Sequence, residues 1–146
     1  MNTHTTKAPR NKEPQRMDSE LTRSEKKIGK ALVNAAYMIH KKLGPGLHEK
    51  VYEVCLAHEL RKVGFEVKRQ VDIPIRYDGL IFEEGLRLAI PINDLVIAEI
   101  KSVKQVNPVW EAQIISHLKF TQKRLVYLIN FNVPLIKNGI RRFINT

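Results

Sequence analysis

The sequence has little cysteine and no long apolar run, and both absences limit what the protein can be. It contains one cysteine, Cys55, so it cannot form an internal disulfide, which is usual in a reducing cytoplasm. No apolar segment approaches the ~20 residues of a membrane-spanning helix, and residues 1–20 offer no apolar stretch for a signal peptide. We therefore expect a cytoplasmic protein that does not enter the membrane. A chain of 146 residues with 43% hydrophobic content is enough for one domain with a core.

Acidic residues are also scarce relative to basic ones. The chain holds 15 Asp and Glu against 25 Lys and Arg, a formal net charge of +10, and residues 1–20 account for only +1 of it. An excess of this size on a small domain favours a polyanionic partner, nucleic acid (DNA or RNA) before a membrane, although it also fits general solubility. Residues 1–20 are polar and contain proline, which predicts a disordered arm ahead of a domain over residues 21–146.

The domain shows apolar periodicities of two kinds, and the first is helical. Apolar side chains recur three and four residues apart over 21–43, 47–63 and 109–121, which predicts three helices, the first two separated by Gly44-Pro45-Gly46. On the third helix we expect the core-facing stripe to consist of Val109, Ala112, Ile115 and Leu118.

The second periodicity is that of strands. Asp78-Gly79 is typical of a two-residue hairpin turn between two extended segments, and 138–146 reads as a short tail or helical turn. The extended segments predicted from the sequence are 65–70, 71–77, 80–92, 95–103 and 124–131. This order of helices and strands predicts an α+β fold with a central mixed sheet flanked by helices.

Two opposite charges, Glu99 and Lys101, interrupt the apolar segment INDLVIAEIKSV. Residues two apart in a strand share a face. An isolated Glu-x-Lys pair is most often a solvated pair at a strand end, but here the apolar residues 95–98 precede it, and burying a charge without a partner is costly. A divalent cation is one such partner, and a lysine beside it can orient water or offset the charge of a phosphate.

A second polar group lies on the predicted helix 47–63. Glu49, Tyr52 and Glu53 are spaced i, i+3 and i+4 and share one side, which either faces protein or is a solvated acidic face near a helix start. On the third helix, Gln113 lies at the edge of the apolar stripe, where Gln and Trp110 could contact a nucleotide. Cys55-x-x-His58 supplies one pair where a structural zinc needs four ligands, so we interpret it as structural.

These segments together resemble a known bacterial family, the GxxExxY proteins. Gly46, Glu49 and Tyr52 fit the G-x-x-E-x-x-Y signature, and the segments LGPG, EIKSV, EAQIISHLK and LINFNVPLIKNGIRRFIN also look like that family. The resemblance covers residues 21–145. The family is assigned to the PD-(D/E)XK nuclease superfamily, which implies a restriction-endonuclease-like αβββαβ core, a bound divalent metal (Mg²⁺ or Mn²⁺) and phosphodiester hydrolysis.

Carried over position by position, the resemblance implies metal ligation by Glu49 and Glu99. It also implies that Lys101 positions water or stabilises the transition state, and that Gln113 orients substrate or the metal shell. The metal-binding aspartate is expected in a stretch like G-Y-R-x-D. Here that stretch reads GLRLA, and the aspartate position holds Ala89.

The substitution at Ala89 removes a ligand, because a methyl group has no lone pair. Glu83, Glu84 and Asp94 are poorly spaced substitutes. A strict two-residue turn at Asn93-Asp94 would place residue 88 opposite Glu99, so the family geometry requires a three-residue turn or a bulge to bring 89 there. We therefore predict a nuclease-like protein that is inactive or impaired. The alternative is a non-catalytic module that binds nucleic acid or protein, and homo-oligomerisation remains open.

Overall fold

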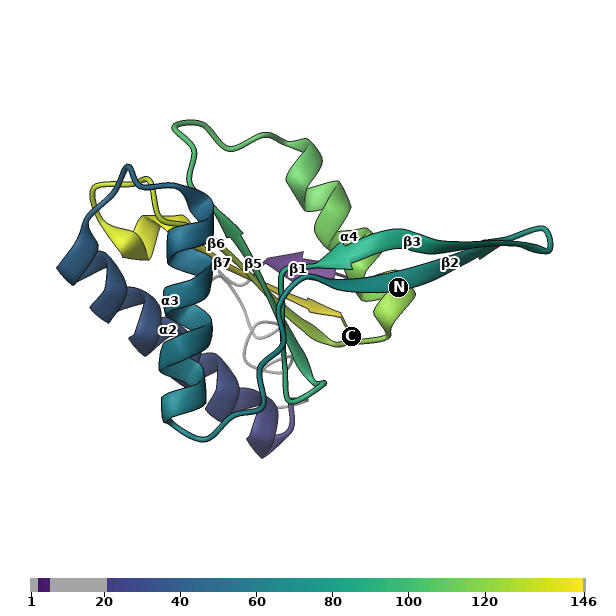
Figure 1. Cartoon of the computed structure of the whole chain (residues 1–146), viewed down its shortest axis with the longest axis horizontal. Helices are drawn as coiled ribbons and strands as arrows, with labels where there is room; N and C mark the ends of the chain where they lie inside the picture. The colour runs from purple at the N-terminus through teal and green to yellow at the C-terminus, as the bar shows by residue number, and fades with distance from the viewer. Residues whose placement is uncertain (1–2, 6–20, 146) are drawn as a thin grey trace.

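A mixed β-sheet with helices on both faces forms the centre of the computed structural model, which describes residues 3–5 and 21–145 (Figure 1). Across the sheet the strands run in the order β1 (Thr3–Thr5), β7 (Ile140–Asn145), β6 (Leu125–Asn130), β5 (Val96–Lys101) and β4 (Ile90–Ile92). Strands β5 and β6 are parallel and the other neighbours are antiparallel, so the predicted mixed sheet is confirmed. Of the predicted arm, residues 1–2 and 6–20 lie outside the described residues.

Two helices, α2 (Arg23–Leu43) and α3 (Glu49–Lys62), cover one face of the sheet, and α4 (Val109–Thr121) covers the other. The alternation of side chains along β5 divides the core accordingly. Val96, Ala98 and Ile100 pack with α2 and α3, whereas Ile97 packs with α4. Because Glu99 and Lys101 share the parity of Ile97, the charged pair lies on the α4 side of a buried strand.

The helix boundaries follow local signals in the sequence. Thr22 and Glu25 form a capping box at the start of α2, in which the Thr22 N–H donates to the Glu25 carboxylate over 2.7 Å. At the other end, Gly44 (φ 72°) donates its N–H to the His40 carbonyl. The helices predicted over 21–43 and 47–63 are therefore confirmed; α2 ends at the predicted residue, and the other three ends lie one or two residues inside the predicted ones.

A two-stranded hairpin, β2 (Val71–Tyr77) and β3 (Leu80–Leu88), projects from the body of the protein (Figure 1). Asp78 and Gly79 have φ values of 49° and 81°, as a two-residue primed turn requires, so the predicted turn is confirmed. Only the base of the hairpin packs on the body, through residues next to the α4 core.

Three predicted segments differ from the structure. Residues 65–70 form no regular strand; Val67 makes one isolated bridge to Ile92, and Gln70 turns the chain away with φ 55°. The predicted strand 80–92 is two strands, β3 and β4, because the chain bends at Ala89. The predicted tail is a 3₁₀ turn, η1 (Ile136–Gly139), followed by strand β7, which pairs with β6.

The buried face of α4 also differs from the predicted stripe. Ile114, His117 and Leu118 are buried, whereas Val109 and Ile115 are 49% and 45% exposed. In this rotation Ile114 and Leu118 pack against the sheet, and His117 lies 3.3 Å from Glu99 across the interface between sheet and helix.

Candidate active site

The loop between α2 and α3 is fastened by Tyr52. Its hydroxyl donates to the Gly44 carbonyl over 2.5 Å and accepts from the Leu47 N–H over 3.1 Å. Its ring, fully buried, stacks on Phe131 with 4.4 Å between centroids and 2° between planes. The loop therefore has a fixed shape just before Glu49, which is the first residue of α3.

The same loop is tied to the end of β5. The Ser102 hydroxyl, directly after the strand, donates to the Leu47 carbonyl over 2.6 Å. The start of α3 is thereby held beside the end of β5, where Lys101 lies. Two segments that are some fifty residues apart in sequence come together at this point.

The electrostatics of Glu49 show which charges surround it. Partial burial raises the pKa of the Glu49 carboxyl, Lys101 acts in the opposite direction, and the carboxylates of Glu53 and Glu99 raise the pKa further. Glu49, Glu99 and Lys101 therefore lie within electrostatic reach of one another. The structure thus brings together three of the four residues that the sequence singled out.

Glu99 is held by position 89 and by α4. Its Oε2 accepts the Ala89 N–H over 3.1 Å and lies 3.3 Å from Nδ1 of His117. Both side chains are largely buried, at 13% and 7% exposure. The sequence did not single out His117, since a histidine on a helix gives no sign of a distant carboxylate partner.

The register of β4 and β5 explains the contact at position 89. Ile90 pairs with Ala98 and Ile92 with Val96, so Ala89 stands opposite Glu99. Residues 93–95 form the turn, closed by a bond from the Leu95 N–H to the Ile92 carbonyl. The three-residue turn that the family geometry requires is therefore present.

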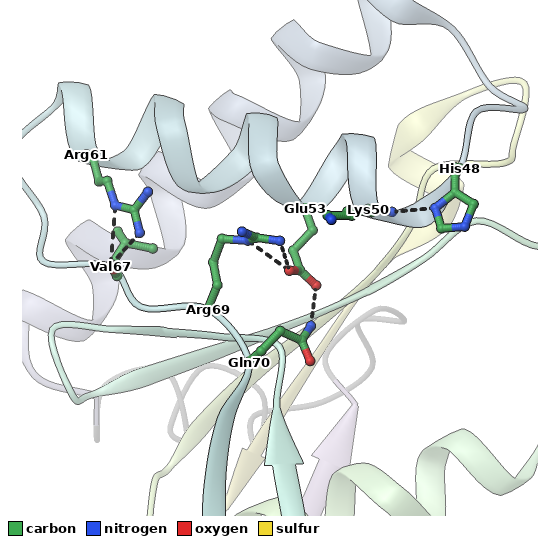
Figure 2. Close-up of polar contacts among 7 residues, drawn as sticks. All are labelled: His48, Lys50, Glu53, Arg61, Val67, Arg69 and Gln70. Carbon is green, nitrogen blue, oxygen red and sulfur yellow. Dashed lines mark hydrogen bonds and ion pairs between the residues drawn. The ribbon is translucent and has the colours of Figure 1, made fainter.

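A second carboxylate, Glu53, is buried on α3 with partners of its own (Figure 2). It is 3% exposed; Arg69 donates to its Oε2 over 2.9 Å and the Gln70 side chain to its Oε1 over 2.8 Å. The Gln70 backbone N–H in turn donates to the Ala89 carbonyl over 2.9 Å. Tyr52 and Glu53 therefore face protein, whereas Glu49, at the start of the helix, is only partly buried.

The remaining candidates lie toward α4. The Lys101 ammonium is 5.0 Å from the centroid of the Trp110 ring, a cation–π contact at the start of α4. Gln113 is exposed on the same helix. It stands one turn before His117 and so on the same side as the residue that contacts Glu99.

The residues present do not fit a divalent ion held by paired carboxylates. No three His, Cys, Asp or Glu side chains gather as a metal site among the described residues. Asp94 is 87% exposed and lies 2.9 Å from Lys123, whose hydrogen bond lowers the pKa of that carboxyl. Glu83 and Glu84 are exposed on the hairpin. None of the three replaces the missing ligand at position 89.

Comparison with known proteins gives the family. A family model described as the PD-(D/E)XK nuclease superfamily matches residues 26–143, most of the chain. The protein therefore belongs to that superfamily, and its α+β fold agrees with the assignment. No curated protein and no solved structure gives a significant match. Within the described residues, no helix is both long and apolar enough to cross a membrane.

Proposed function

We propose that the chain is a cytoplasmic, GxxExxY-type nuclease-like domain in which phosphodiester hydrolysis is lost or strongly impaired. Nucleases of the superfamily generally use Mg²⁺ or Mn²⁺. The observation that carries the proposal is the environment of Glu99. The strand register places the methyl group of Ala89 opposite the Glu99 carboxylate. The Ala89 N–H and His117 contact this carboxylate where a second acid is expected.

Each of the other polar residues of the candidate active site has a role in this proposal. Glu49 and Glu99 supply carboxylates from two elements, and Lys101 places a positive charge beside them where a phosphate would approach. Gln113, on the exposed side of α4, would orient the nucleic acid. With Ala89 in place, this set lacks the second strand carboxylate on which positioning of an attacking water depends.

The test restores the missing acid. Ala89→Asp should raise Mg²⁺- or Mn²⁺-dependent cleavage of DNA or RNA by roughly hundredfold or more, because positioning errors in such sites cost rates of that order. The matched control is the double variant Ala89→Asp/Glu99→Gln, which should be inactive and thereby excludes a contaminating nuclease. A restored protein that cleaves no nucleic acid and binds no metal would refute the nuclease interpretation.

A second candidate function is a non-catalytic nucleic-acid-binding module, and the charge of α2 favours it. The exposed residues of this helix include six cations, Arg23, Lys26, Lys27, Lys30, Lys41 and Lys42. Its one acid, Glu25, is 3% exposed and pairs with Arg124 over 2.6 Å, so the solvent side of the helix carries positive charge alone. Such a stripe suits a phosphate backbone.

Binding to nucleic acid is measured separately from cleavage. Affinity should fall steeply with salt, and Lys41→Gln/Lys42→Gln should reduce the slope of log K against log salt by about 0.9 for each duplex phosphate that the variant no longer neutralises. The control Lys119→Gln removes an exposed lysine on α4, which lies across the sheet from α2. Absence of binding at low salt would leave the protein-interaction role as the alternative.

A further inference from the structure

The far end of the β2–β3 hairpin exposes more large apolar side chains than solubility explains. In the hairpin tip, residues 75–84, the exposed fractions are 71% for Tyr77, 57% for Leu80, 50% for Ile81 and 51% for Phe82. Tyr77 pairs with Leu80 and Ile75 with Phe82 across the two strands, so Ile75, Tyr77, Leu80 and Phe82 share one face, whereas Ile81, which pairs with Arg76, lies on the other. A contiguous apolar face of this kind on a projecting hairpin is typical of a docking surface.

The charge of the hairpin tip is opposite to that of the rest of the protein. It carries three acids, Asp78, Glu83 and Glu84, against one cation, Arg76, on a chain whose net charge is +10. A phosphate backbone would be repelled by this acidic segment. The partner that fits is a protein surface with an apolar centre and a basic rim.

The described part of this chain offers such a surface, between α2 and the end of α3. A groove of about 380 Å³ lies there, within the range of sites that take large side chains. The residues that line it include Lys27, Lys30, Ala35, Met38, Val63 and Phe65. We call it the α2–α3 groove; most of its lining is apolar, and its charged residues are the two exposed lysines and Glu59, which leaves it a net positive charge.

The position of the two surfaces excludes a contact within one chain. The hairpin extends away from α2 and α3, which lie at the opposite side of the molecule (Figure 1). We propose that the hairpin tip of one chain docks in the α2–α3 groove of a second copy. Tyr77, Leu80 or Phe82 would fill the groove, while Glu84, two residues beyond Phe82 along the strand, faces Lys27 and Lys30. The proposal is independent of the proposed nuclease lineage.

The expected strength of self-association follows from the size of the contact. One hairpin tip covers less than the ~1,200 Å² typical of a stable interface, so a single contact is weak and a reciprocal pair of contacts is stronger. Because the tip and the groove are different surfaces, the contact either occurs twice in a closed two-fold pair or continues from copy to copy as a longer head-to-tail assembly. Self-association should therefore depend on concentration and weaken as salt screens the charges.

The test is sedimentation velocity on the full chain with exchanged charges. Glu83→Lys/Glu84→Lys and Lys27→Glu/Lys30→Glu should each weaken self-association about tenfold or more, because each places like charges at the contact. A mixture of the two variants should associate again, since every tip then meets a groove of opposite charge. Phe82→Ser, at an exposed position, should weaken association without changing the fold, as circular dichroism would verify.

The control Lys41→Glu/Lys42→Glu changes the same charge on α2 outside the groove and should leave association intact. A wild-type chain that stays monomeric at its highest soluble concentration in low salt would overturn the proposal. Association that survives both charge variants, or a mixture that fails to associate, would also overturn it. Failure of cleavage would not bear on it, because Glu83, Glu84, Phe82, Lys27 and Lys30 all lie outside the candidate active site. Lys27 and Lys30 also belong to the basic face of α2, so Phe82→Ser is the variant that separates the two proposals: it should weaken self-association and leave nucleic-acid binding unchanged.

Discussion

Replacing Ala89 with aspartate should make the folded protein less stable without metal and responsive to Mg²⁺. Residue 89 is 9% exposed, and its N–H lies 3.1 Å from Oε2 of Glu99. An aspartate there would bring a second carboxylate close to a buried one. Two carboxylates about 5 Å apart repel by roughly 3 kcal/mol at an effective dielectric constant of 20. Part of this cost is relieved when one of the two binds a proton, which raises its pKa.

A divalent ion bound between the two carboxylates of the variant would offset their repulsion by neutralising their charge. A ligand present at tenfold its dissociation constant stabilises the folded state by about 1.4 kcal/mol. For a domain of this size, that corresponds to a rise in the melting temperature of about 3–6 °C. The wild-type chain has one carboxylate at this place and should show no such rise.

The assay is thermal unfolding followed by circular dichroism, with EDTA or with millimolar Mg²⁺. Ala89→Asn is the matched control, because it has nearly the same shape as aspartate and carries no charge. We expect Ala89→Asp to melt below Ala89→Asn in EDTA and to gain stability in Mg²⁺, with the asparagine variant unaffected. Equal melting temperatures of the two variants in EDTA, together with no response of the aspartate variant to Mg²⁺, would refute the placement of residue 89 beside Glu99.

Three further perturbations follow from other contacts. The pKa of Glu49 is raised above its ordinary 4.5, so its ionisation opposes folding once the pH exceeds that value. Glu49→Gln should therefore raise the free energy of unfolding near pH 7 by less than about 1 kcal/mol, because solvent screens this partly buried side chain, and should leave it unchanged at about pH 3.5; the same effect at both pH values would contradict this. Arg69→Ala leaves Glu53 buried without its cation and should lower the free energy of unfolding by about 3 kcal/mol in urea titration, with partial recovery on adding Glu53→Gln. Gly29→Ala should destabilise the protein by about 1–3 kcal/mol, although alanine normally favours a helix, because the added methyl would collide with the Tyr127 hydroxyl; a stabilised variant would count against this packing.

The features that the sequence predicted well depend on local chemistry. The limits of α2 and α3 follow from Thr22, Gly44 and the spacing of apolar residues, and the hairpin turn follows from Asp78-Gly79. The position of Glu99 in a buried strand also follows from its apolar neighbours. In each case, the deciding interaction lies within a few residues of the signal.

The features that the sequence did not predict depend on distant partners. On α4, Ile114 and Ile115 are adjacent, so the apolar pattern fits two rotations of the helix, and the contact of His117 with Glu99 belongs to only one of them. The segment of β7 has two successive arginines and no alternation, and it is a strand because β6 offers an edge. Arg69 gives no local sign that it meets Glu53, sixteen residues earlier.

The anchoring role of Tyr52 has a consequence for how signature residues are interpreted. Its hydroxyl joins Gly44 to Leu47, and its ring rests on Phe131, so these contacts shape the backbone of the loop. A domain that no longer cuts phosphodiesters would still misfold at this loop without it. Retention of the tyrosine therefore records the need for a particular scaffold, and the residue at position 89 is the better guide to whether the chemistry has survived.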